Sequence, residues 1–407
     1  MSSKLKNYQT TNVLESLPLS NDPKRDMVCG VEQNSFELIS NGKRFIVEPN
    51  DYYKNNIELF DSMFYSIGVF YSIAANYFPK VIYSDRALNK NVIEMINLYY
   101  KRMALDYPDI VDSSIMDFST NFFKYKKMSE DKAIVALSGG KDSVYALVKA
   151  VEKYGKDNVV AVIVNSIMRI LPVEELESSK KVCDILGVKL IVVPIHYSFK
   201  KYRGIYNGAE ISMATALMVP IAFEYGIKNI ILGTLKSEKD IFQVQAPTIS
   251  ETGTIIDLFN NFLRDINLDM VVSSGVLDTK ESLVYLMKNR PDIMSETVSC
   301  MMLSHIYQSH KNRAIKKYPN FPFYQRMCGV CPKCMTINVF RLRYEEKLKN
   351  LCIDKNVYEY CRHVFNVIIK NKNNFKPEVI DEMEDILIES MEKYEINIWG
   401  NNYEFVK

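Results

Sequence analysis

A short polar segment, SGGKDS at residues 138–143, stands between an apolar run and a helical pattern. Residues 133–137 have the composition of a buried strand, and apolar residues recur at helical spacing from 144 to 151. Two adjacent glycines allow a sharp turn, which brings backbone N–H groups together at the positive end of the helix dipole. The segment therefore favours binding of an anion such as phosphate, and a glycine turn without a ligand is the alternative.

Cysteines form the second group of residues that could do chemistry. Three of the eight, Cys328, Cys331 and Cys334, are spaced three apart in CGVCPKC, and Cys300 lies 28 residues before the first of them. Four thiolates can surround one ion in a tetrahedron, and such a site leaves no open position for a substrate. We predict a structural Zn²⁺ site from these four residues. An iron–sulfur cluster and unliganded cysteines are the alternatives.

The elements around the SGGKDS segment alternate between strand and helix. Strands are predicted at 133–137, 158–164, 188–193 and 229–233, and helices at 143–154, 174–186 and 209–225. Alternation of this kind, with buried β-branched strands, indicates an α/β fold with a doubly wound parallel sheet. Ligands of such sheets bind beyond the carboxyl ends of the strands at the switch point, which is where the SGGKDS segment would lie.

The pattern divides the chain into three predicted domains. Residues 1–128 form an N-terminal α+β domain, which includes a hairpin around 40–43 and two aromatic-rich helices. A charged run marks the boundary before the nucleotide domain at 129–299. Residues 300–407 form a C-terminal helical region that the cysteine site would hold together. The aromatic stripe is interpreted as core or domain interface, with a base-stacking surface as the alternative.

Composition excludes some functional classes. The 407 residues include 51 basic and 49 acidic side chains, and this balance argues against a large nucleic-acid surface. We find no stretch of about 18 apolar residues for a membrane span and no secretory signal near the N-terminus. Cysteines crowded after residue 300 in such a chain indicate metal binding rather than disulfides. We expect a cytoplasmic protein.

The SGGKDS segment resembles the pyrophosphate loop, or PP-loop, of ATP pyrophosphatases in the adenine nucleotide alpha-hydrolase-like superfamily. From residue 138 to about 343 the chain is similar to the 7-cyano-7-deazaguanine synthases (QueC type), through this loop, the segments 208–234 and 277–300, and CGVCPKC. The chain departs from that family at Lys141, where glutamine is usual, and at Glu210, where asparagine is usual. Longer relatives occur in antiphage defence operons, and this extended chain resembles them.

The resemblance implies ATP cleavage between the α and β phosphates, with Mg²⁺ bridging them and pyrophosphate held by the loop. The implied catalytic residues are Lys141, Asp142 and Ser143, although a solvated lysine is the alternative for Lys141. The residues that would contact the nucleotide are Ser138, Gly139, Gly140, Lys141, Asp142, Ser143, Val164, Asn165 and Gly233. Glu210 and Asp240 are candidates for the substrate pocket, and His196 is a weaker candidate base.

The function that follows is an ATP-dependent ligase that adenylates a carboxylate or amide of a deazaguanine-like small molecule. A nitrogen nucleophile then accepts the activated group, and this acceptor could be a protein. Sulfur transfer is one alternative, and it needs a reactive cysteine such as Cys183, which instead falls in a helical core pattern. A non-catalytic nucleotide-binding subunit of a complex is another. Tyrosine-rich helices suggest a homo-oligomer or a partner subunit, whereas no membrane partner is expected.

Overall fold

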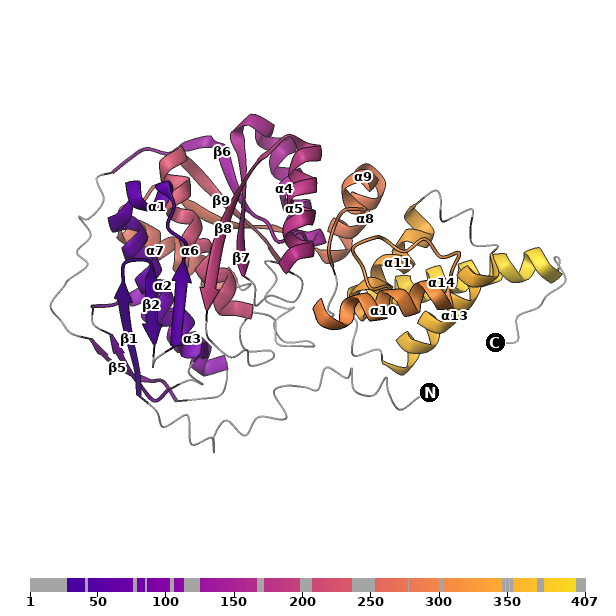
Figure 1. Ribbon diagram of the computed structural model, residues 1–407, viewed down its shortest axis with the longest axis horizontal. Helices are drawn as coiled ribbons and strands as arrows, with labels where there is room; N and C mark the ends of the chain where they lie inside the picture. The colour runs from indigo at the N-terminus through magenta and orange to yellow at the C-terminus, as the bar shows by residue number, and fades with distance from the viewer. Residues whose placement is uncertain are drawn as a thin grey trace. The chain divides into compact units, whose positions relative to one another are not determined.

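The computed structural model describes residues 28–40, 43–75, 79–84, 86–102, 106–112, 125–166, 172–197, 207–235, 253–276, 278–299, 304–345, 348, 351, 354–371 and 377–399. Within these residues, ten strands form one sheet in the order β10-β9-β6-β7-β8-β3-β2-β1-β4-β5. Figure 1 labels β1, β2 and β5 to β9 of this sheet. The strands are β1 (Val28–Asn34), β2 (Glu37–Ser40), β3 (Lys43–Val47), β4 (Val81–Ser84), β5 (Asp109–Asp112), β6 (Ser129–Ala136), β7 (Val159–Ser166), β8 (Lys189–Tyr197), β9 (Ile227–Leu235) and β10 (Val271–Val276).

Helices account for most of the remaining described chain. They are α1 (Asp51–Asn55), α2 (Ile57–Ala75), α3 (Lys90–Arg102), α4 (Lys141–Tyr154), α5 (Pro172–Leu186), α6 (Asn207–Tyr225), α7 (Gly253–Asp265), α8 (Thr279–Asn289), α9 (Pro291–Met294), α10 (Ser304–Lys317), α11 (Pro332–Tyr344), α13 (Lys355–Lys370) and α14 (Pro377–Trp399), with a short 3₁₀ turn at Lys156–Asn158.

Strands β8, β7, β6, β9 and β10 are parallel and form the doubly wound part of the sheet. Val135 of β6 pairs with Ala161 on one side and with Ile231 on the other, so β6 lies between the two halves. The chain order reverses there, which makes the end of β6 the switch point of the sheet. The predicted α/β fold with a mostly parallel sheet is confirmed, and the SGGKDS segment follows β6 directly.

The N-terminal strands extend the same sheet. Strand β3 pairs antiparallel with β8, with Phe45 opposite Tyr197, and β2 and β3 form the predicted hairpin. Strands β1, β4 and β5 continue the sheet as parallel neighbours. The segment at 28–112 therefore joins the doubly wound strands in one hydrogen-bonded sheet through the pairing of β3 with β8.

The core of this sheet is aromatic and aliphatic. Helix α6 packs on α2 and on strands β6 and β9, while α7 packs on α3 and β10. Tyr53, Tyr65 and Tyr71 are fully buried, and the Tyr53 hydroxyl donates to the carbonyl of Leu217 at 3.1 Å. The interpretation of the aromatic stripe as core is thus confirmed, because these rings are closed to a nucleobase or a partner. The homo-oligomer stays a prediction.

Contacts divide the chain into two compact units. The first contains the whole sheet, the helices packed on it and the last nine residues of α4. The second contains residues 138–145, residues 172–185 of α5 and the described chain from 278 onward. These units describe which residues contact one another. They do not test the predicted domain boundaries at 128/129 and 299/300, which stay predictions.

The C-terminal part of the second unit is helical, as predicted. Helix α14 packs on α11 and α13, and α8 packs on α11. Polar and aromatic contacts join these helices: Arg343 pairs with Glu389 at 2.7 Å, and the rings of Tyr358 and Tyr394 stack at 4.5 Å. Helix α8 therefore packs on a helix, α11, that is itself held by later helices of the chain.

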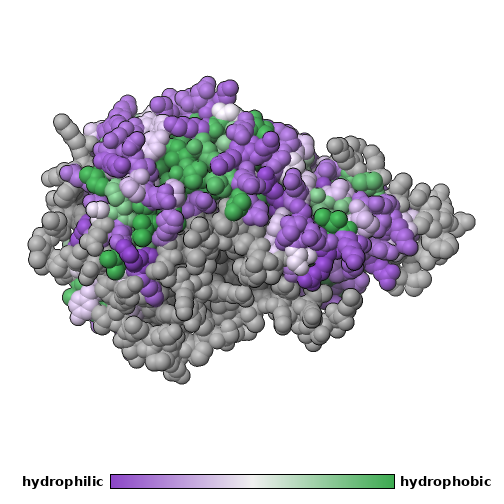
Figure 2. Space-filling model, in the orientation of Figure 1, coloured by the Kyte–Doolittle hydropathy of each residue, from purple (hydrophilic) through white to green (hydrophobic). Residues whose placement is uncertain are grey.

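Hydrophilic side chains cover much of the described surface that Figure 2 shows, and hydrophobic side chains form smaller groups among them. Among the described helices, none is both long enough and apolar enough to cross a bilayer.

Candidate functional site

The SGGKDS loop is closed by hydrogen bonds between its own residues. The backbone N–H of Ser138 donates to the Ser143 hydroxyl at 3.1 Å, and that hydroxyl donates to the carbonyl of Gly140 at 3.0 Å. Gly139 has φ of +69°, a left-handed conformation that glycine adopts without steric cost. A β-carbon there would lie 2.9 Å from both the Glu175 carbonyl oxygen and the Ser178 hydroxyl. The backbone therefore requires glycine at 139 for two independent reasons.

The loop presents backbone donors at a helix N-terminus. Among the described residues, the N–H groups of Gly139 and Gly140 have no hydrogen-bond partner. Helix α4 begins immediately afterward at Lys141, so its positive dipole end points toward the same place. Unpaired N–H groups and a helix dipole together favour a bound anion.

The two charged side chains of the loop contact each other. Lys141 Nζ lies 2.5 Å from Asp142 Oδ1, and the Ser282 hydroxyl from α8 donates to the same carboxylate oxygen at 2.9 Å. The Lys141 side chain is only 9% exposed, so the alternative of a solvated lysine is wrong. The Asp142 side chain is 35% exposed, so part of the carboxylate is accessible to solvent. The loop thus combines a buried positive charge with an accessible carboxylate.

Residues far away in the sequence clamp the loop backbone within the second unit. The carbonyl of Gly139 accepts from the Val298 N–H at 2.8 Å and from the Ser178 hydroxyl at 3.2 Å. The N–H of Lys141 donates to the Ser299 hydroxyl at 3.0 Å. Sequence reasoning missed these serines as loop contacts. The available signal was their position, because Ser282 and Ser299 both fall in the segment 277–300 that carries part of the family resemblance.

Other predicted nucleotide contacts lie in the first unit. Val164 and Asn165 belong to β7, and Gly233 belongs to β9. The Asn165 side-chain oxygen is buried without a partner among the described residues, and so is the Thr234 hydroxyl. Unsatisfied buried polar atoms are uncommon, and a ligand is one way to satisfy them. Thr234 was not among the predicted site residues.

Two of the predicted strands, at 158–164 and 188–193, are longer in the structure and include polar residues that the prediction left outside them. Asn165 lies inside β7, where it pairs with Pro194, because β8 continues the ladder beyond the β-branched run. His196 lies inside β8, pairs with Ile46 of β3, and contacts Glu48 at 2.8 Å on an exposed surface. The strand predicted at 188–193 therefore ended too early, because β8 continues to Tyr197.

Some predicted site residues are not described. Asp240 and Cys300 lie outside the described residues, and Glu210 lies in α6 with its side chain outside the description. Their roles stay predictions.

The three cysteines of CGVCPKC form a buried cluster. The sulfur atoms of Cys328, Cys331 and Cys334 all lie within 4.8 Å of one another, and none is in a disulfide. Cys328 and Cys334 have their sulfurs 3.8 Å apart, which equals the edge of a tetrahedron with Zn–S bonds of about 2.3 Å. The Cys331 N–H also points at Cys328 Sγ at 3.4 Å. The donor set therefore fits a thiolate-bound metal ion.

A buried polar network supports the cysteine turn from outside. The Tyr360 hydroxyl donates to the Gly329 carbonyl at 3.0 Å and accepts from Asn338 at 2.9 Å. Arg341, which is 2% exposed, donates to Asn338 and to the carbonyl of Pro322. Desolvation raises the pKa of Tyr360 well above its usual range, so this hydroxyl stays protonated as a donor. The turn is held in shape by these contacts as well as by any bound ion.

Two cysteines outside this cluster have described side chains. Cys183 and Cys361 are both buried. Desolvation, with a smaller contribution from Asp184, raises the pKa of Cys183 to about 12. A thiol with so high a pKa has almost no thiolate at neutral pH, and the thiolate is the reactive form.

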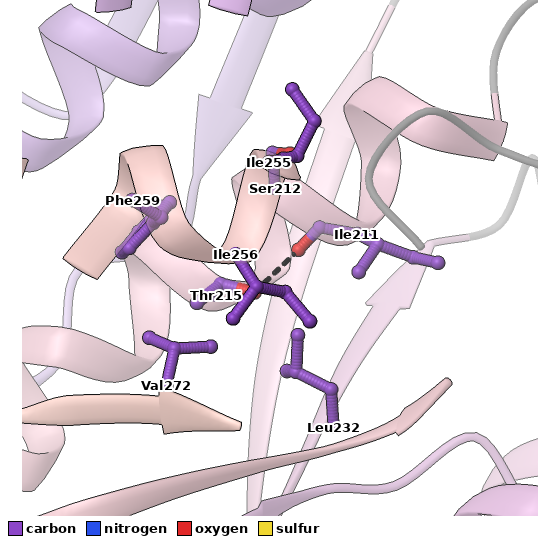
Figure 3. Close-up of a pocket in the computed structure, with 8 residues that line it drawn as sticks. All are labelled: Ile211, Ser212, Thr215, Leu232, Ile255, Ile256, Phe259 and Val272. Carbon is purple, nitrogen blue, oxygen red and sulfur yellow. Dashed lines mark hydrogen bonds between the residues drawn. The ribbon is translucent and has the colours of Figure 1, made fainter. Parts of the chain in front are cut away.

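The first unit also contains a cavity of about 10 Å³ between α6, α7, β9 and β10 (Figure 3). Its lining is mostly aliphatic and aromatic, and the Thr215 hydroxyl donates along its own helix to the Ile211 carbonyl at 2.8 Å. A volume this small is at the lower limit for one water molecule. We interpret it as a packing gap and not as a substrate pocket.

Part of this chain is similar in sequence to a known family. Residues 113–220 match the sequence model of the family described as NAD synthase. The glutamine-dependent NAD(+) synthetase of Thermotoga maritima is 32% identical over 89 residues, which cover 21% of this chain and only 15% of that protein.

Solved structures show only weak similarity. The U34-tRNA thiolase NcsA from Methanococcus maripaludis, solved with its 4Fe-4S cluster, has a TM-score of 0.31 at 12% identity, covering 79% of this chain and 88% of that one. A glutamine-dependent NAD+ synthetase from Acinetobacter baumannii, in complex with ADP, has a TM-score of 0.25 at 12% identity, covering 60% and 64%. Scores this low bear on neither the chemistry nor the ligands of the site. The sequence match contains the SGGKDS loop, so this part of the chain, residues 113–220, is similar to the NAD synthase family.

Proposed function

We propose that this protein is an AMP-forming, ATP-dependent ligase that joins an activated carboxylate or amide to a nitrogen nucleophile. The observation that carries the proposal is the SGGKDS loop at the switch point of the sheet, with the N–H groups of Gly139 and Gly140 free among the described residues. The match to NAD synthases supports a nucleotide-dependent reaction, and a glutamine-dependent synthetase among the relatives fits a nitrogen acceptor.

In this proposal the substrate oxygen attacks the α-phosphate of ATP, and the bond to the β-phosphate oxygen breaks. Pyrophosphate leaves with the bonding electron pair, and the loop N–H groups and Lys141 stabilise the charge that develops on it. The nitrogen nucleophile then attacks the adenylated carbon, and AMP leaves. The accessible Asp142 carboxylate is the candidate ligand for Mg²⁺, which would neutralise phosphate charge when bound.

The cysteine cluster has a different task in the proposal. Cys328, Cys331 and Cys334 would hold Zn²⁺ as a structural ion, with Cys300 as the predicted fourth ligand. A metal in such a closed site stabilises the fold and takes no part in the bond exchange. An iron–sulfur cluster remains the competing occupant, and metal analysis of the purified protein separates the two.

We take 7-carboxy-7-deazaguanine as the first substrate to test, because of the resemblance of segments 208–234 and 277–300 to deazaguanine synthases. Sulfur transfer is the less favoured reaction, since Cys183 and Cys361 are buried. A protein acceptor, a partner subunit and a role in antiphage defence are extensions that the same assay can pursue once the first product is known.

The test is mass spectrometry of products formed from Mg·ATP and 7-carboxy-7-deazaguanine, with and without ammonia. AMP, pyrophosphate and an amide or nitrile of the base are the expected products. Asp142→Asn should lose this activity, whereas the control Asp157→Asn, at an exposed position after the same helix, should keep it. If AMP forms with another carboxylate and not with 7-carboxy-7-deazaguanine, the proposed deazaguanine substrate is wrong. The absence of AMP with any carboxylate, while ATP still binds, would favour a non-catalytic nucleotide-binding subunit.

A further inference from the structure

We propose that Ser299 is a positioning residue that couples metal binding at the cysteine cluster to the conformation of the SGGKDS loop. The inference rests on the proposed function, because it assigns this coupling an effect on ATP binding. Every contact involved lies within the second unit.

The first step is the contact between residues 298–299 and the loop. Val298 and Ser299 are each 6% exposed, and together they bond both sides of the glycine pair. The Val298 N–H donates to the Gly139 carbonyl at 2.8 Å, and the Ser299 hydroxyl accepts from the Lys141 N–H at 3.0 Å. Lys141 is the first residue of α4, so one of the orphan donors at this helix start is satisfied by a residue 158 positions away.

The second step is the contact between the same segment and the cysteines. The Ser299 carbonyl oxygen lies 4.0 Å from Cys334 Sγ. In the sequence, Ser299 also directly precedes Cys300, the predicted fourth ligand. A single residue therefore has its side chain on the loop and its backbone against the cysteine cluster.

The third step concerns what else could hold this segment. Residues 297–299 belong to no helix or strand, so no ladder of backbone bonds fixes them. The Thr297 hydroxyl donates to the Met294 carbonyl at 2.9 Å, which anchors the segment at its N-terminal side. On its other side the Ser299 carbonyl contacts Cys334 Sγ, and the Tyr360 hydroxyl, with Asn338, supports the cysteine turn through the Gly329 carbonyl.

Metal binding to the cysteines would accordingly order residues 298–299, and these would order the loop. Release of the metal would leave the loop backbone less constrained, and the protein would then pay part of the ordering entropy when ATP binds. One buried hydrogen bond lies between the two sites, so we expect a coupling of about 2- to 10-fold in affinity.

The experiment is a four-way comparison of affinity for α,β-methylene-ATP, which this reaction cannot cleave. Wild type and Ser299→Ala are each measured by calorimetry with the metal bound and after removal by a chelator. We expect metal removal to weaken binding several-fold in wild type and much less in Ser299→Ala. An equal loss in the two proteins, or no loss in wild type, would overturn the coupling.

A second measurement keeps the test valid if the metal-free protein unfolds, or if no nucleotide binds. Hydrogen exchange of the peptide covering 138–145 is compared in metal-loaded, nucleotide-free Ser299→Ala and Ser295→Ala. Ser295 is the matched control, since its hydroxyl bonds only locally to the Asp292 carbonyl. Faster exchange in Ser299→Ala alone, with unchanged metal content, supports the positioning role, and equal exchange in both variants refutes it. Failure of wild type to bind the analogue would count against the proposed function and not against this contact.

Discussion

Replacing Gly139 by alanine should damage the loop more than the same replacement at a comparable glycine elsewhere. Gly226 is the control, because its φ of +63° nearly equals the +69° of Gly139. Alanine in the left-handed region costs about 1–2 kcal/mol at either position. A β-carbon at 226 has no heavy atom within 4 Å, whereas one at 139 meets the Glu175 carbonyl and Ser178 at 2.9 Å. Overpacking of this kind adds about 1–3 kcal/mol.

The assay is urea denaturation of Gly139→Ala and Gly226→Ala, together with the affinity of each for α,β-methylene-ATP. We expect Gly226→Ala to lose about 1–2 kcal/mol of unfolding free energy and to bind the analogue as wild type does. Gly139→Ala should lose about 2–5 kcal/mol in all, or move the loop and lose nucleotide binding. Equal stability losses with nucleotide binding intact in both variants would refute the reasoning, since the extra contacts at 139 would then have no energetic effect.

Two further predictions concern cysteines. The purified protein should contain about one metal ion per chain. Cys331→Ser should lose both the ion and thermal stability, whereas Cys183→Ala should keep the ion. Elemental analysis of the two variants checks this, and a full metal content in Cys331→Ser would contradict it. The raised pKa of Cys183, about 12 against an ordinary 9.0, means that the folded state holds this proton when the unfolded state releases it. The stability that the protonated Cys183 thiol contributes is therefore complete below pH 9 and is lost as pH rises toward 12. At pH 10 the free energy of unfolding should be lower by about 1.4 kcal/mol from this group. Denaturation from pH 8 to 10 should show a smaller fall in Cys183→Ala, and an equal fall would contradict the assignment.

Local patterns predicted the parts of this structure that local interactions determine. The β-branched runs became β6, β7, β8 and β9, and helical periodicity located α4, α5 and α6. The spacing of three between Cys328, Cys331 and Cys334 likewise brought three sulfurs together, because residues so close in the chain share one turn and the start of one helix.

Long-range contacts explain what the sequence could not predict. The loop partners Ser282 and Ser299 lie 140 and 158 residues from the atoms they contact, and no periodicity connects positions so far apart. The predicted ends of the strands were wrong for the same reason. Strand β7 extends to include Asn165 because Pro194 of the neighbouring strand lies opposite it. Strand β10 and helix α7 were missed as well, since the predicted alternation of strands and helices stopped at residue 233.

The antiparallel pairing of β3 with β8 has a consequence for any shortened form of the protein. A chain beginning at residue 129 would leave β8 as an edge strand, with its backbone donors and acceptors around Ile195 and Tyr197 open along that side. Such an edge is a template for pairing with a second molecule. The N-terminal strands thus protect β8, and with it the parallel part of the sheet, against self-association.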